Sequence, residues 1–173
     1  MKKPKEKIKK IHSLRHQITA YFIGLLFLSI LTITVINGAF LEKYYVTKKI
    51  DVLLNLRTTL ENTDIDKMMN SNSSKGMESI PDEIQRACSR NNLSWVIIDS
   101  SNTSWLSWGE NEKMLQSKLF GYVYDLDEDG DKSRTLKQGD NYTIQQSHDR
   151  FAGMDYVECW GQFDNGYYFL IRS

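Results

Sequence analysis

The sequence predicts an α+β protein whose N-terminal helix crosses a membrane and continues into a long helix. Three observations indicate this fold class. A run of 23 residues without a charged side chain begins at Ile18. Several later segments are rich in β-branched and aromatic residues and are separated by turn residues. Segments with helical periodicity are segregated from most of these strands, as in antiparallel α+β layouts and unlike the regular alternation of α/β proteins.

The uncharged run covers residues 18–40 and predicts a transmembrane helix. At about 1.5 Å per residue it is long enough to cross a hydrocarbon core of roughly 30 Å. Its Ser and Thr hydroxyls can bond back to carbonyls of the same helix. A cleaved signal peptide has a shorter apolar stretch followed by small residues, whereas this run ends in Gly38-Ala39-Phe40-Leu41. We therefore expect an uncleaved anchor.

Charge is distributed unevenly along the chain and predicts the orientation of the anchor. Residues 1–17 hold seven of the 22 basic side chains and one of the 22 acidic ones, so residues 18–173 carry a net charge of −6. The positive-inside rule places the basic leader, 1–17, in the cytoplasm and residues 41–173 outside the cell membrane. Leader lysines can also bind nucleic acid, but an acidic folded body argues against that function.

Residues 41–62 predict a long helix that continues the spanning segment. Its apolar residues lie near one helical face, and two interpretations remain open for that face. It packs against its own domain, or it forms part of a homodimer interface together with the membrane helix. The residues concerned are Val46, Ile50, Leu53, Leu54, Leu56 and Leu60.

The remaining sequence predicts a five-stranded antiparallel sheet with flanking helices between residues 80 and 173. Polar residues 62–79 are typical of a loop. Ser79-Ile-Pro-Asp82 has the form of a capping box and predicts a helix from about Ile80 to Asn91. Asn165-Gly166 favours a type I′ hairpin turn. The expected strands are 93–99, 104–108, 142–146, 155–163 and 166–171, with a further helix at 110–124.

Sequence features at both ends of the chain resemble those of a known family. They are Ile11-His-Ser-Leu-Arg15 in the basic leader, the single span, and the ending Asn141-Tyr-Thr-Ile144, Tyr156-Val-Glu-Cys-Trp-Gly161 and Asn165-Gly-Tyr-Tyr-Phe-Leu-Ile-Arg-Ser173. With this order of elements, the chain resembles the N-terminal sensor portion of a bacterial membrane sensor histidine kinase. The resemblance implies a PAS-like extracytoplasmic fold.

The resemblance also implies a function. In such kinases a second membrane helix, a linker, a phosphoacceptor helix and an ATPase domain follow the sensor, so we expect a signal-input region truncated before these parts at Ser173. Its stimulus would be an unknown small ligand or membrane stress, and its cognate response regulator would act through the missing part. No catalytic residue can be assigned here. The alternative is a membrane-tethered binding or envelope-structural module without a signalling role.

One acidic segment suggests a cation site. Asp125, Asp127, Asp129, Gly130 and Asp131 reproduce the start of a calcium-binding loop, in which alternate carboxylates surround a hard cation. The twelfth position is Leu136, where an EF-hand loop needs a bidentate Glu. Both a Ca²⁺ site and a solvated acidic loop remain open.

Other residues capable of chemistry lack a convincing arrangement. Cys88 falls on an apolar helical face and Cys159 in a strand, which favours buried free thiols over a disulfide. His12 and His16 are spaced for chelation but have no third ligand nearby. A serine hydrolase would need a nucleophile elbow, which the sequence does not contain. Aromatic residues gather in the strand region, where they form either a filled core or a ligand pocket.

Overall fold

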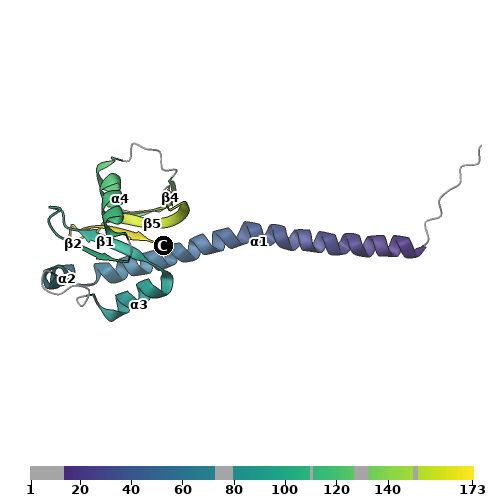
Figure 1. Cartoon of the computed structure of the whole chain (residues 1–173), viewed down its shortest axis with the longest axis horizontal. Coiled ribbons are helices and arrows are strands. Elements are labelled where there is room, and N and C mark those ends of the chain that lie inside the picture. Colours follow the sequence, from purple (N-terminus) through teal and green to yellow (C-terminus); the bar gives the residue numbers. More distant parts are fainter. Residues whose placement is uncertain (1–13, 73–79, 110, 127–132, 150–151) are drawn as a thin grey trace, which may run out of the picture. The chain divides into compact units, whose positions relative to one another are not determined.

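The computed structural model describes residues 14–72, 80–109, 111–126, 133–149 and 152–173. The helices are α1 (Leu14–Glu61), α2 (Ile65–Asn72), α3 (Asp82–Asn91) and α4 (Glu112–Tyr124). The strands are β1 (Ser94–Ile98), β2 (Trp105–Trp108), β3 (Arg134–Gln138), β4 (Tyr142–Asp149), β5 (Met154–Gln162) and β6 (Tyr168–Arg172). The chain divides into two units, residues 1–44 and 45–173 (Figure 1).

The first unit contains the N-terminal part of α1. The helix is long and apolar enough to cross a membrane, and the side chains of its most apolar stretch are exposed. Hydroxyl groups donate hydrogen bonds to carbonyls one turn earlier, as Thr32 does to Leu28 at 2.8 Å and Ser29 to Leu25 at 3.0 Å. These bonds satisfy the hydroxyl donors without any partner outside the helix, which suits a hydrocarbon environment.

The second unit contains a six-stranded antiparallel sheet in the order β2-β1-β6-β5-β4-β3. The expectation of five strands was therefore wrong by one, because Arg134–Gln138 forms an additional edge strand. Leu136 is its one partly buried residue, and the ladder with β4 shifts register between Thr135 and Lys137. An edge strand with so little apolar surface shows almost no alternation in its sequence.

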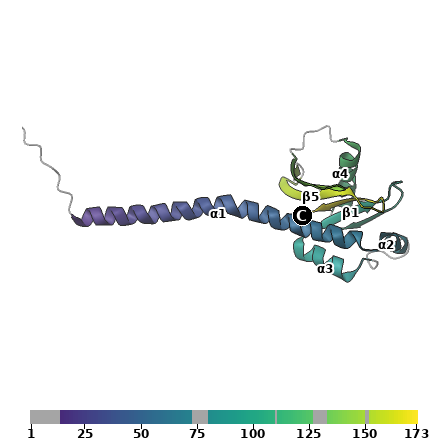
Figure 2. The same ribbon diagram turned by 180° about the vertical axis from the view of Figure 1, so that it is seen from behind.

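Helices cover both faces of this sheet (Figures 1 and 2). Leu53, Leu56 and Leu60 of α1 are buried with α2, α3 and one sheet face, which confirms core packing for this stripe. Dimerisation through α1 stays a prediction. Helix α4 packs through Leu115 and Leu119 against the opposite face. Strand β1 is buried on both sides, which explains its continuous apolar run.

Local details differ from expectation at three places. Residues 65–72 form α2 rather than loop, through burial of Ile65 and Met68. Helix α3 starts at Asp82 with Pro81 at its N-cap and no side-chain cap; Ser79 of the expected capping box lies outside the described residues. In the β5–β6 turn only Gly166 has a positive φ, of 90°, so the turn is not type I′. The Gly166 N–H donates to the Phe163 C=O at 2.9 Å, and the Phe163 N–H donates to the Tyr167 C=O at 2.9 Å, so residues 164–166 form a three-residue loop.

Candidate ligand-binding site

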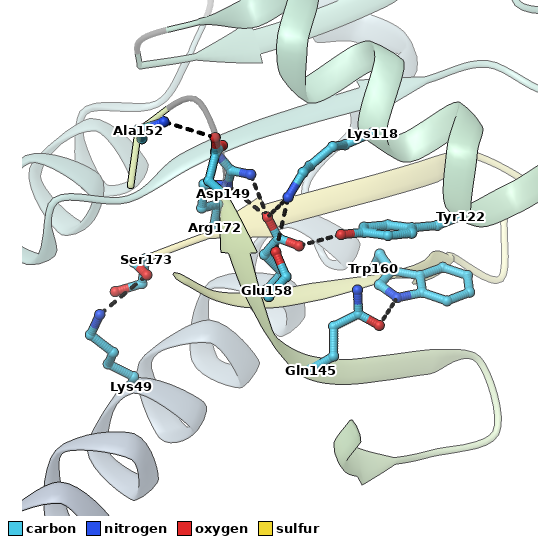
Figure 3. A network of polar contacts seen from close by, with 11 residues as sticks. Lys49, Lys118, Tyr122, Gln145, Asp149, Ala152, Glu158, Trp160, Arg172 and Ser173 are labelled. Carbon is cyan, nitrogen blue, oxygen red and sulfur yellow. Dashed lines mark hydrogen bonds and ion pairs between the residues drawn. The ribbon is translucent and has the colours of Figure 1, made fainter. Parts of the chain in front are cut away.

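The sheet face under α4 carries a buried polar network on strands β4, β5 and β6 (Figure 3). Alternation of side chains directs Ile144, Val157 and Cys159 to the other face, with α1 and α3. Their neighbours in sequence therefore face α4, and several residues on that face are polar. The buried polar side chains are Gln145, Ser147, Asp149, Glu158 and Arg172.

Glu158 is the centre of this network and is completely buried. Its Oε1 accepts a hydrogen bond of 2.7 Å from Arg172 Nε, and Arg172 Nη2 lies 2.6 Å from the same oxygen. Lys118 Nζ, from α4, lies 3.4 Å from Oε1 and 2.9 Å from Ser147 Oγ. Tyr122 OH donates a 2.6 Å hydrogen bond to Oε2. Both carboxylate oxygens are thus engaged, as burial of a charge requires.

Arg172 connects Glu158 to a second buried carboxylate. Its Nη1 lies 3.1 Å from Asp149 Oδ2, and Asp149 Oδ1 accepts a 3.0 Å hydrogen bond from the Ala152 N–H. The guanidinium lies 4.2 Å from the centre of the Tyr156 ring. Two acids and two bases therefore balance each other, and together they join α4 to the last three strands.

Tyr122 and Gln145 link the network to Trp160. Burial, reinforced by the neighbouring Glu158 carboxylate, raises the pKa of Tyr122 far above its usual value, so the hydroxyl stays protonated as a donor. The Tyr122 ring stacks on Trp160 with a centroid distance of 5.3 Å. Trp160 Nε1 donates to Gln145 Oε1 at 3.3 Å (Figure 3). The indole is therefore held from its face and from its nitrogen.

Trp160 also lines a cavity of about 540 Å³, which we name the turn cavity. The cavity is lined by Val123 in the last turn of α4, residues 138–143 of the β3–β4 turn, residues 160–164, Gly166 and Tyr168. Its volume is in the range of sites for small organic ligands. We therefore take the turn cavity, with the network that holds Trp160, as the candidate ligand-binding site.

Gly161, in the cavity wall, lies so close to the backbone of the neighbouring strand that it has no room for a Cβ atom. A Cβ at Gly161 would lie 2.1 Å from the Asn141 carbonyl oxygen, a backbone atom held by the Gln162 N–H at 3.0 Å. We expect Gly161→Ala to destabilise the protein by about 1–3 kcal/mol, because the two strands must separate. Gly139→Ala meets only the movable ring of Tyr142 and should cost less. Urea unfolding of both variants measures this order, and an equal or reversed order would contradict it.

The predicted calcium ligands are only partly described. Asp125 is exposed and forms the C-cap of α4 in a left-handed conformation, with φ of 51°. Asp127, Asp129 and Asp131 lie outside the described residues. Within the described residues no group of three or more His, Cys, Asp or Glu side chains could hold a metal ion. The calcium site stays a prediction.

The two cysteines are free and buried, as the sequence analysis favoured. Burial raises the pKa of the Cys88 thiol to about 11 and that of the Cys159 thiol to about 12. Both stay thiols at neutral pH and are poor nucleophiles. Of the histidines, His12 lies outside the described residues, His16 is exposed, and His148 Nδ1 contacts Asp155 at 2.6 Å.

The network around Glu158 was not predicted, although the sequence contains a signal for it. Glu158 lies between the apolar residues Val157 and Cys159, and Arg172 follows Phe-Leu-Ile in β6. The two residues are directly opposite in the β5–β6 ladder. A charged residue of each sign inside apolar strands of one hairpin indicates a buried ion pair.

Comparison with family models, with curated proteins and with solved structures found no match to this chain.

Proposed function

We propose that this chain is the signal-input region of a bacterial membrane sensor kinase, with a PAS-like domain outside the cell. The observation that carries the proposal is the helix α1. Its N-terminal part is long and apolar enough to span a membrane, and Leu53, Leu56 and Leu60 near its C-terminal end are buried in the core of the sheet domain. One continuous helix therefore belongs to both units.

The C-terminal strand supports the same proposal. Lys49 Nζ of α1 donates a 3.2 Å hydrogen bond to the Ser173 carbonyl (Figure 3). Ser173 directly follows Arg172 of the buried network in the sequence. A rearrangement of α4 or of the turn cavity can thus reach α1 through Glu158, Arg172 and β6. Transmission through such a contiguous network requires that it has two discrete arrangements.

The basic leader supports the proposed orientation, and cysteine labelling tests it. Ser89 is exposed on α3, whereas the native Cys88 and Cys159 are buried. We expect a membrane-impermeant maleimide to label Ser89→Cys in intact cells, and Ser13→Cys only after permeabilisation. The unsubstituted chain controls for the native thiols. If only Ser13→Cys is labelled in intact cells, the orientation is the opposite of the proposed one, and an extracytoplasmic sensor is excluded.

A signalling role is tested by gene expression in the cells that carry this gene. Transcripts are compared between cells with the intact gene and cells from which it is deleted, with and without envelope stress. A signal-input region predicts a defined set of transcripts that loses its stress response on deletion and recovers it on complementation. Unchanged transcripts together with altered envelope integrity would instead establish the envelope-structural module.

A further inference from the structure

The walls of the turn cavity combine negative charge with aromatic rings. Asp140 lies in the β3–β4 turn and Asp164 in the β5–β6 turn, and both carboxylates are exposed to solvent. None of the described residues that line the cavity is Lys, Arg or His. The aromatic lining residues are Tyr142, Trp160, Phe163 and Tyr168. From this chemistry we propose that the turn cavity binds an organic cation with an ammonium group.

Aromatic rings favour such a cation over a small inorganic one. The faces of Trp and Tyr attract ammonium groups and accommodate their methyl or methylene substituents. Trp160 is held by Tyr122 and Gln145, so its ring is already fixed before a ligand arrives. One cation of this chain already lies near two of these rings: the Arg57 guanidinium is 5.1 Å from the Tyr142 ring centre and 5.9 Å from that of Phe163. Arg57 does not line the cavity, and Glu61 neutralises it at 3.0 Å.

The backbone adds further negative potential. Val123 brings the last turn of α4 to the cavity, and that turn contains no basic side chain. The carboxyl end of a helix carries a partial negative charge that attracts cations.

Internal hydrogen bonds hold the two turns in place. Asn141 Nδ2 donates to Asp164 Oδ1 at 2.7 Å and thereby ties one turn to the other. The Gly139 N–H donates to the Tyr142 C=O at 2.9 Å, and the Phe163 N–H to the Tyr167 C=O at 2.9 Å. A cavity held in this way loses little entropy when a ligand binds.

Isothermal titration of the detergent-solubilised full chain tests the proposal. The cationic probes are choline, benzyltrimethylammonium and spermidine; 3,3-dimethyl-1-butanol is the neutral isostere of choline, and benzoate is the anionic probe. We expect at least one cation to bind at millimolar concentration or more tightly, and neither counterpart to bind as well. The double variant Asp140→Asn with Asp164→Asn should bind that cation about tenfold more weakly, since two carboxylates near the ammonium are lost.

A matched variant, Asp51→Asn with Asp82→Asn, removes the same charge from exposed positions outside the cavity and should bind like the wild type. The proposal is overturned if no cation binds, if the neutral isostere binds equally well, or if the cavity and matched variants behave alike. Whether this cation is the stimulus of the protein rests on the proposed signalling role. Binding without any transcript response would refute signalling alone, and a response without cation binding would refute the ligand alone.

Discussion

Replacing Glu158 by Ala is expected to destabilise the sheet domain, residues 45–173, by about 3–5 kcal/mol, a large part of the stability of an ordinary domain. The substitution leaves Arg172 buried with one carboxylate partner and removes an acceptor from both Lys118 and Tyr122. Uncompensated buried charge is among the few causes of such large effects. Chemical unfolding, followed by tryptophan fluorescence, measures the change.

Two controls show whether charge burial is the cause. Asp155 lies on the same strand at an exposed position, and its contact with His148 is also exposed. We therefore expect Asp155→Ala to lower the free energy of unfolding by less than about 1 kcal/mol. The double variant Glu158→Ala with Arg172→Met removes both charges and should lose less stability than the two single variants added together. Additive losses, or a Glu158→Ala variant as stable as Asp155→Ala, would show that the network is not an energetic unit.

Placing two arginines in the middle of the apolar run should remove the chain from the membrane. An arginine at the centre of a spanning helix costs about 2.5–3.5 kcal/mol on insertion scales, so Leu26→Arg with Ile30→Arg costs about 5–7 kcal/mol. We expect the double variant to disappear from the carbonate-resistant membrane fraction. Leu14→Arg with Gln17→Arg adds the same charge before the run and should fractionate like the wild type. Retention of both variants in that fraction would mean that residues 18–40 do not span the membrane.

Elements rich in apolar residues were predictable from the sequence. Residues 18–62 were expected as a spanning helix that continues into a long one, and α1 extends from Leu14 to Glu61. Helix α4, strands β1 and β2 and the β5–β6 hairpin lie within two residues of their expected bounds. In α4, Leu115 and Leu119 contact the core one helical turn apart, so their spacing reports the helical period. In β1 both faces are buried, so its β-branched and aromatic residues, and not a period, indicate a strand.

The missed elements have little apolar surface of their own. Strand β3 is stabilised by its ladder with β4, in which Thr135 lies opposite Gln145, and not by its own pattern. Among the side chains that the structure describes in α2, Ile65 and Met68 are buried and Met69 is partly buried, so this short helix depends on the core that it contacts. Tertiary context decides such segments, and local propensity does not.

The candidate site was predictable only in its composition. The sequence shows that aromatic residues gather in the strand region, but their separation into core and cavity walls depends on strand register. Phe163 and Trp160 both line the turn cavity, yet Phe163 stacks on Phe169 in the core while Trp160 stacks on Tyr122. The carboxylates Asp140 and Asp164 come together only because β3, β4, β5 and β6 pair in order.

The central proposal is that the sheet domain signals through the continuous helix α1. An insertion into α1 at the boundary between the two units tests this proposal most directly. Gly-Gly inserted after Tyr44 weakens the helix by about 2 kcal/mol and shifts its phase by about half a turn, while the apolar run and the buried Leu53, Leu56 and Leu60 stay unchanged. A seven-residue helical insertion at the same place, close to two turns, keeps the helical phase and serves as the control. The readout is the set of transcripts that depends on this gene. The account predicts that Gly-Gly abolishes their stress response and that the seven-residue insertion retains it, with both proteins folded and in the membrane. A full response from the Gly-Gly protein would contradict signalling through α1.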